Sequence, residues 1–148
     1  MKKEPLVFEE PYVADYQCSV GKAGTRFFTE LKDNKKILGT RCPECDLVYF
    51  PPRSICGTCL SRLDEWKELG NQGTLMTYTV VHYPSPAHPM EPPFAYGIIK
   101  LDGADTCISH LMGEVDFEKI VIGMRVHAVF QEKRSGNMFD IKYFKPLK

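Results

Sequence analysis

Two closely spaced pairs of cysteines constrain this chain of 148 residues more than any other feature. Pro-Glu separates Cys42 from Cys45, Gly-Thr separates Cys56 from Cys59, and ten residues lie between the two pairs. Two residues between cysteines allow both thiolates of a tight turn to point at one centre, and two such turns supply the four sulfurs of a tetrahedral zinc site. The spacing therefore predicts a local zinc ribbon, and its short loops keep the entropic cost of closure low.

The predicted site is closed, because all four expected ligands are cysteine and no position remains for water. A closed zinc site is structural rather than catalytic. Iron in a rubredoxin-like site is the alternative metal, since the same thiolates bind either ion, and it would make the chain a coloured electron carrier. Asp46 and Leu60 follow the two pairs where glycine is usual. Asp tolerates the left-handed conformation expected there and Leu adopts it poorly, so some distortion of the second turn is expected.

The composition is that of a folded domain without a strong electrostatic partner. Hydrophobic residues make up 43% and charged residues 26%, which allows a packed core. Lys plus Arg and Asp plus Glu both number 19, and this balance argues against electrostatic binding of the whole protein to nucleic acid or a membrane surface. No apolar stretch approaches the roughly 18 residues of a membrane span or forms a signal-peptide core. We therefore expect a cytoplasmic protein, whose reduced thiols hold a metal.

The signals along the chain divide it into three segments. Residues 1–36 are expected to form an arm and then a short helix that Thr25 caps and Asn34 ends. Residues 37–64 form the zinc ribbon. In residues 65–148, runs rich in β-branched and aromatic residues alternate with turn signals, which indicates a small barrel. The strands are expected at 66–69, 74–82, 94–101, 106–111, 124–131 and 138–144. The predicted fold is mainly β, and α+β overall.

Signatures of catalysis are missing from the sequence. It contains no phosphate-binding loop and no GxGxxG, GxSxG or HExxH motif. Cys107 is expected to be a buried small hydrophobe in a strand, with His110 on the opposite face. The loop 84–93 carries five prolines and is either the wall of a binding site or a stiff connection. These observations favour a binding or accessory role, with no catalytic residue in this chain.

Several stretches together resemble the zinc-ribbon/OB-fold proteins associated with acyl-CoA and thiolase-type enzymes. They are residues 27–45, the run Tyr-Phe-Pro-Pro-Arg at 49–53, the second cysteine pair, and the segments 73–79, 93–103 and 122–126. The resemblance implies an N-terminal helix, a rubredoxin-like zinc ribbon and a C-terminal OB-type barrel. It also implies a non-catalytic accessory subunit that helps to hold coenzyme A. Its partner would be a thiolase-fold or hydroxymethylglutaryl-CoA synthase-like protein, which carries the catalytic cysteine.

A coenzyme A site needs cations for the phosphates, a stacking surface for the adenine and a narrow apolar passage. The candidates for contact with coenzyme A or the partner are Lys35, Lys36, Arg53, Tyr78, His82, Phe94 and Tyr96. Each aromatic side chain has core packing as its alternative. A nucleic-acid-binding module is the competing hypothesis, because zinc ribbons and OB barrels both occur in such proteins. Residues 65–148 lack the basic excess that this hypothesis requires.

Overall fold

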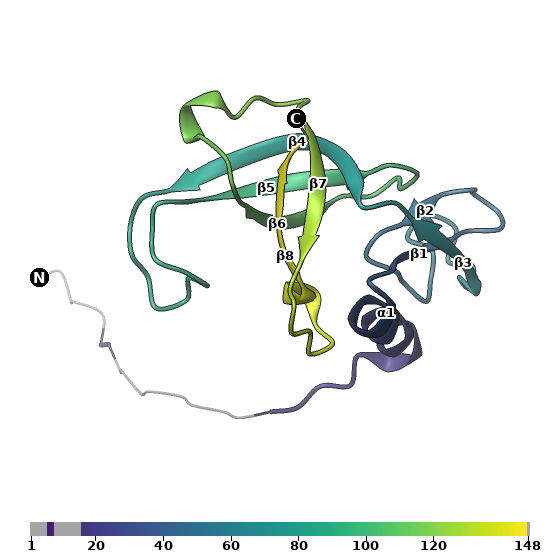
Figure 1. Cartoon of the computed structure of the whole chain (residues 1–148). Helices are drawn as coiled ribbons and strands as arrows, with labels where there is room; N and C mark the ends of the chain where they lie inside the picture. Colours follow the sequence, from purple (N-terminus) through teal and green to yellow (C-terminus); the bar gives the residue numbers. More distant parts are fainter. Residues whose placement is uncertain (1–5, 8–15, 148) are drawn as a thin grey trace, which may run out of the picture.

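The computed structural model describes residues 6–7 and 16–147. Within them the chain forms one α-helix, a three-stranded sheet and a closed five-stranded barrel (Figure 1). This arrangement confirms the predicted fold class. Most of the expected N-terminal arm, at residues 1–5 and 8–15, lies outside the described residues. In the part that is described, no helix is long and apolar enough to cross a bilayer.

Helix α1 spans Gly21–Asn34 and begins upstream of the expected cap. The Ser19 hydroxyl accepts a hydrogen bond from the Gly21 amide (3.2 Å). The Thr25 hydroxyl instead donates to the Gly21 carbonyl (2.8 Å) within the first turn, so the prediction that Thr25 caps the helix is wrong. The chain turns into the left-handed conformation at Lys35 (φ 55°), immediately after the expected terminator Asn34.

The small sheet has β1 (Ile37–Arg41) at its centre, between β2 (Val48–Tyr49) and β3 (Glu65–Leu69), and both pairings are antiparallel. β3 opens the segment expected to form the barrel (65–148), yet it pairs with β1 along its full length. The expected bounds of the three segments stay a prediction. The first cysteine pair lies between β1 and β2, and the second lies between β2 and β3.

The barrel closes in the order β4-β5-β6-β8-β7, with β7 pairing back to β4. Its strands are β4 (Gln72–Val81), β5 (Phe94–Leu101), β6 (Ile108–Met112), β7 (Arg125–Phe130) and β8 (Ile141–Pro146). Short 3-10 turns lie at Phe117–Lys119 (η1) and Met138–Asp140 (η2). The turn η2 occupies the start of the strand predicted at 138–144, which therefore begins later than expected. Closure leaves no open sheet edge in the barrel.

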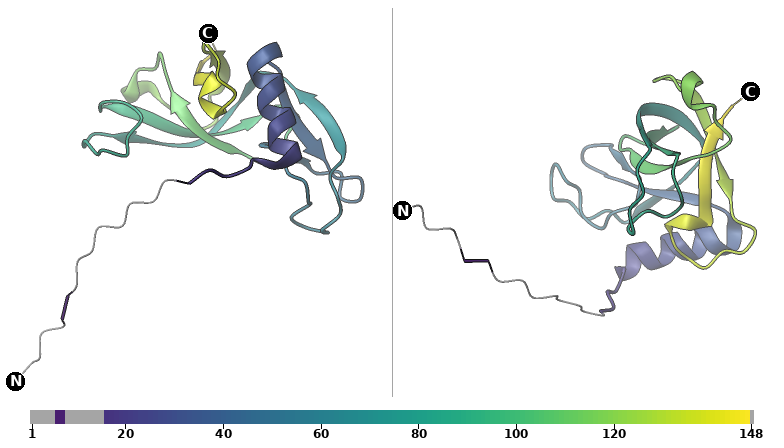
Figure 2. Two further views of the ribbon diagram at one scale, coloured as in Figure 1. Left: turned by 90° about the horizontal axis from the view of Figure 1, so that it is seen from below. Right: turned by 90° about the vertical axis from the view of Figure 1, so that its left-hand side faces the viewer.

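The main apolar core runs without interruption from the helix into the barrel. Phe27 and Leu31 of α1 belong to the same buried cluster as Leu75, Ile99 and Phe144 of the barrel strands. Phe27 and Leu31 are four residues apart, so they lie on the same face of the helix. Figure 2 shows α1 lying beside the barrel and against the small sheet. The helix therefore shares one core with both sheets.

The connection between β7 and β8 is hydrogen-bonded to helix α1. Arg134 donates through Nε to the Lys32 carbonyl of α1 (2.5 Å). The buried Asp140 carboxylate accepts the amides of Ser135 and Gly136, both at 2.8 Å. A buried carboxylate needs such donors to offset its desolvation. These bonds give the connection a fixed shape beneath α1.

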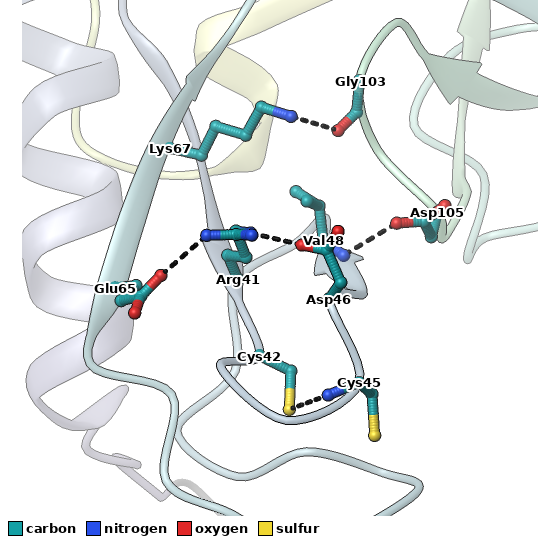
Figure 3. Close-up of polar contacts among 9 residues, drawn as sticks. All are labelled: Arg41, Cys42, Cys45, Asp46, Val48, Glu65, Lys67, Gly103 and Asp105. Atoms are coloured by element: carbon teal, nitrogen blue, oxygen red, sulfur yellow. Dashed lines mark hydrogen bonds and ion pairs between the residues drawn. The ribbon is translucent and has the colours of Figure 1, made fainter.

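A reciprocal set of hydrogen bonds joins the small sheet to the barrel. The Val48 amide donates to the Asp105 carboxylate (2.8 Å; Figure 3). The Asp105 amide donates in turn to the Val48 carbonyl (2.8 Å). Next to them, the Thr106 hydroxyl accepts from the Phe50 amide (2.7 Å) and donates to the Phe50 carbonyl (2.8 Å). We call these four bonds the seam. The seam holds the strand between the two cysteine pairs against the β5–β6 connection.

Candidate metal centre and binding surfaces

The four predicted cysteines meet at one point, and their Sγ atoms all lie within 4.8 Å of one another. Cys42 and Cys56 are buried, Cys45 is half-buried and Cys59 is exposed. Zinc takes four thiolates at Zn–S distances of about 2.3 Å, and sulfurs this close fit such a tetrahedron. The donor set therefore fits a structural zinc ion, which would be held by these residues and would tie the two loops together.

Both cysteine turns have the backbone shape of a metal-binding knuckle. Asp46 (φ 59°) and Leu60 (φ 64°) both adopt the left-handed conformation. In each turn the amide of the first cysteine donates to the carbonyl five residues on, at 2.8 Å in the first turn and 2.9 Å in the second. The Cys45 amide also points at Cys42 Sγ (3.4 Å; Figure 3). Leu60 therefore does not prevent the second turn from closing like the first.

Hydrogen-bond donors distinguish the thiols of the two turns. The backbone amide of Cys59, the Tyr49 hydroxyl and the Thr58 amide together lower the pKa of Cys56 to about 5. Hydrogen bonding to the Cys59 sulfur and burial raise the pKa of Cys45 to about 12. A bound metal ion would override this difference, because a coordinating thiol is deprotonated outright. Of these two thiols, Cys56 is therefore the one whose hydrogen-bond donors favour the thiolate.

Arg41 connects the first cysteine turn to the small sheet through two ion pairs. Arg41, at the end of β1, reaches Asp46 through Nε (2.5 Å) and Glu65 of β3 through a terminal nitrogen (3.3 Å) (Figure 3). Beside it lies a groove of about 750 Å³ between the small sheet and the barrel. Its charged lining residues carry both signs: Arg41, Lys67, Lys100, Asp46, Asp102 and Asp105. This mixture favours neither an anion nor a cation.

Of the three predicted binding cations, Lys35 and Lys36 lie between α1 and β1, and Arg53 lies between β2 and β3. Lys35 is exposed at the end of α1. Lys36 forms an ion pair with Glu68 of β3 (2.8 Å). The Arg53 guanidinium lies over the Tyr49 ring, 5.4 Å from its centroid. Two of the three cations thus already have protein partners, and their role in ligand binding stays a prediction.

The predicted aromatic and histidine candidates gather on β4 and β5 and at the start of the proline-rich loop. Tyr78 and His82 are exposed and Tyr96 is half-buried. Phe94 is buried, with the His88 ring at 5.2 Å and the Tyr96 ring at 5.7 Å. Phe94 therefore holds the loop in place rather than facing solvent. Within the described residues, no hydrogen bond or ring contact links this group to the predicted cations.

Cys107 and His110 lie on opposite faces, as expected, but the prediction that Cys107 is buried is wrong. β6 begins at Ile108, and its alternation points Cys107 outward. His110 is only 3% exposed. Its Nδ1 accepts the Leu111 amide (2.9 Å) and its Nε2 faces the Met138 carbonyl (3.3 Å). Burial lowers the pKa of His110, so the ring is neutral and is not placed to activate Cys107.

The structure reveals a candidate site that the sequence reasoning missed. An apolar cavity of about 650 Å³ lies between the proline-rich loop, the end of β6 and the start of β8. We call it the apolar cavity, and its lining residues are Pro89, Met90, Leu111, Met112, Gly113, Glu114, Gln131, Phe139, Lys142 and Tyr143. These residues come from distant parts of the chain, so no local motif marks them. Of the bounding segments, only the proline-rich loop was noticeable in the sequence.

Two features shape the apolar cavity. The Tyr143 ring lies on Gly113, where a Cβ would come within 2.4 Å of a ring carbon. Glu114 accepts the Tyr143 hydroxyl (2.6 Å) and the Lys145 ammonium (2.8 Å), which fixes the ring. Phe139 stays 54% exposed beside this rigid wall. An exposed aromatic ring next to a preformed apolar hollow is typical of a binding site.

A four-cysteine ribbon hydrogen-bonded to a five-stranded barrel defines the class of zinc-ribbon/OB-fold proteins. Two family matches agree with this class and with the prediction of a zinc ribbon. Residues 29–65 match the family described as ChsH2, rubredoxin-like zinc ribbon domain. Residues 66–131 match ChsH2, C-terminal OB-fold domain.

Comparison with known proteins then identifies the family. A DUF35 domain-containing scaffold protein of Methanocaldococcus jannaschii is 33% identical over 132 residues, which cover 85% of this chain and 92% of the relative. The chain therefore belongs to the DUF35 domain-containing scaffold proteins. This membership confirms the resemblance noted in the sequence.

Two further similarities are to an enzyme subunit and to a solved structure. A probable enoyl-CoA hydratase alpha subunit of Thermomonospora curvata is 29% identical over 101 residues, 68% of this chain and 31% of that protein. The solved structure of an Ltp2-ChsH2(DUF35) aldolase superimposes with a TM-score of 0.63 at 23% identity, covering 88% of this chain and 98% of the matched chain. At this identity the structural likeness supports the fold alone.

Proposed function

We propose that this chain is a non-catalytic, zinc-containing accessory subunit of a thiolase-type acyl-CoA enzyme in the cytoplasm. It helps to bind the coenzyme A thioester and stabilises a thiolase-fold or hydroxymethylglutaryl-CoA synthase-like partner. The partner supplies the catalytic cysteine and makes or breaks the carbon–carbon bond. The apolar cavity beside the proline-rich loop is the observation that carries the coenzyme A part of the proposal.

The closed metal site supports an accessory role. Four thiolates satisfy the tetrahedral preference of zinc and leave no position at which it can activate water or substrate. The exposed thiol of Cys107 lacks the help of His110, whose ring is buried inside the barrel. Membership of a scaffold protein family agrees with this reading. The zinc ion would therefore act by holding the ribbon in shape.

The chemistry of the apolar cavity suits the thin arm or the acyl chain of a coenzyme A thioester. Leu111, Met112 and Phe139 offer apolar contact, and about 650 Å³ is within the usual range of small-molecule sites. Lys142 lines the cavity with its Nζ 5.4 Å from the Tyr143 ring centroid, and its ammonium group could pair with a phosphate. The enoyl-CoA hydratase similarity is a second, independent indication of coenzyme A chemistry. The nucleic-acid hypothesis gains no comparable support, because the cavity lining is mainly apolar.

The first experiment is to isolate the tagged chain from its native host and identify the proteins that accompany it by mass spectrometry. We expect a stoichiometric thiolase-fold partner, because the chain belongs to a family of scaffold proteins and its four-thiolate site leaves no position for catalysis. A chain that purifies alone and also fails to bind coenzyme A contradicts the proposal. A partner from another enzyme class would keep the accessory role and remove the thiolase assignment.

A second experiment tests the cavity in the purified complex. Phe139→Ala removes an exposed ring from the cavity wall, and Ile55→Ala removes an exposed side chain from the ribbon as the matched control. We expect Phe139→Ala to weaken acetyl-CoA binding roughly 10-fold in isothermal titration calorimetry, because an apolar contact of this size contributes about 1.5–3 kcal/mol. The control should bind like the unchanged complex. Equal affinities of both variants would place the ligand elsewhere.

A further inference from the structure

Tyr49 reaches from β2 to the metal centre although it is not a ligand. Its side chain is 4% exposed, and its hydroxyl lies 3.2 Å from Cys56 Sγ. The same hydroxyl accepts the Gly57 amide at 3.1 Å. The phenol oxygen is thus fixed by a backbone donor on one side and meets the sulfur on the other. Packing alone does not require the hydroxyl, which a phenylalanine would lack.

The direction of the contact follows from the chemistry of the metal-bound state. A cysteine that binds zinc does so as a thiolate, which has no proton to donate. The Tyr49 oxygen already accepts from Gly57, so its own proton is free to point at Cys56. The Thr58 amide also points at this sulfur (3.4 Å). Cys56 therefore receives a side-chain donor in addition to the usual backbone donor.

A second layer of contacts holds the tyrosine. The Arg53 guanidinium lies 5.4 Å from the ring centroid, a cation–π distance. The backbone of Arg53 is fixed in turn by the buried Thr40 hydroxyl, which accepts the Arg53 amide (3.0 Å) and donates to the Arg53 carbonyl (3.1 Å). A cation over the ring withdraws electron density from the phenol and strengthens its O–H as a donor.

We propose that Tyr49 is a positioning residue of the metal centre, which orients the Cys56 thiolate through an O–H···S hydrogen bond and slows release of the zinc ion. Partners outside the ligands commonly change metal affinity by 10- to 100-fold. This role explains why the residue between the two cysteine pairs is a buried tyrosine with its hydroxyl turned inward. It also assigns Arg53 to the support of the metal centre rather than to ligand binding.

The test compares Tyr49→Phe with Tyr143→Phe in the full chain. Tyr143 also donates a hydrogen bond, but to Glu114 and not to a cysteine. Zinc transfer to a chromogenic chelator should be roughly 10-fold faster for Tyr49→Phe than for the unchanged protein. In the cobalt-substituted protein, the sulfur-to-cobalt charge-transfer band should move to longer wavelength, because the sulfur lone pair loses a stabilising proton. Tyr143→Phe should change neither quantity.

Equal release rates and identical cobalt spectra for the two tyrosine variants would overturn the proposal. Arg53→Gln provides a second route, since it leaves the buried ring and its hydroxyl in place. It should accelerate zinc release by a smaller factor and shift the cobalt band in the same direction. If Tyr49→Phe does not fold, an unchanged release rate and spectrum in Arg53→Gln overturn the proposal on their own. None of these readouts depends on the activity of a partner enzyme.

Discussion

The two cysteine loops (residues 42–47 and 54–63) and the barrel are stabilised by different means. The buried cluster around the loops consists of Cys42, Cys56 and Leu63 of the loops and Tyr49 of β2, and two of these four residues are predicted metal ligands. The barrel shares a large apolar core with α1 and the small sheet. Small units with little apolar core depend on metals or disulfides, whereas larger cores are stable alone. The comparison predicts that the cysteine loops depend on a metal ion for their structure and that the barrel does not.

Removal of the metal should separate the two parts most clearly. Structural zinc binds zinc-finger peptides with an apparent free energy of about 10–16 kcal/mol, and the loops have little else to replace it. We expect Cys42→Ser, or chelation, to abolish the dispersed amide resonances of the loops in an NMR spectrum while those of the barrel persist. Cys18→Ser, which changes an exposed cysteine outside the site, serves as the control. Ordered loops in the metal-free protein would contradict the prediction that the loops depend on the metal ion.

Loss of core volume should act on the barrel in the opposite way. Phe144 of β8 is fully buried, and its replacement by alanine should lower the free energy of unfolding by about 3–5 kcal/mol. Zinc should remain bound in the folded fraction, because the metal centre lies outside that core. Phe139→Ala, at an exposed site, should cost less than about 1 kcal/mol. Urea denaturation followed by circular dichroism, with zinc content measured in parallel, would show whether the two effects divide in this way.

The seam connects the small sheet to the barrel, and Thr106 is the residue at which its contribution is tested most simply. Thr106→Val keeps the shape of the side chain but removes both hydrogen bonds to the Phe50 backbone. The unpaired amide and carbonyl should cost about 1–3 kcal/mol, with the largest loss of hydrogen-exchange protection at residues 48–50. Thr79→Val, on an exposed part of β4, should change neither quantity. Equal protection in the two variants would show that the seam contributes little.

The sequence predicted best what depends on local spacing. The two cysteine pairs determine their own turns, so the cluster of four thiols could be predicted from the spacing of the cysteines. β5 was predicted with the bounds that it has, because a mainly apolar run lies between Pro92-Pro93 and Asp102-Gly103. The family resemblance added the pairing of ribbon and barrel. None of these inferences required knowledge of distant contacts.

What the sequence could not give depends on partners far along the chain. The apolar cavity combines residues from 89 to 143, which meet only when the barrel closes. Cys107 was predicted as buried because free cysteines are usually buried, but local sequence does not determine which face of its strand points inward, and the structure turns Cys107 outward. Thr25 resembled a helix cap, but Ser19 offered an acceptor further upstream. In each case a tertiary or neighbouring contact decided between local alternatives.

The smallest predicted effect concerns His110 and limits the stability of the barrel in acid. Burial lowers the pKa of His110 in the folded state below its unfolded value, so the unfolded chain binds the proton more readily. Stability should be complete above the unfolded pKa, near 6.5, and should fall as the pH drops below it. Because the Leu111 amide already points at Nδ1, a proton there would face a second donor. We therefore expect stability to decline between pH 7 and pH 5, by less than in the changes above.

Thermal denaturation at a series of pH values would isolate this effect if the zinc site is kept saturated. His110→Gln should be less stable at pH 7, but it should lose less stability than the unchanged protein on acidification, because the titrating group is gone. His82→Gln, at an exposed site, should retain the full dependence. If His110→Gln keeps the same pH profile, the acid sensitivity belongs to the cysteine loops. There, protons compete with zinc for the cysteine thiolates. That outcome would move the acid-labile element from the barrel to the metal-dependent part.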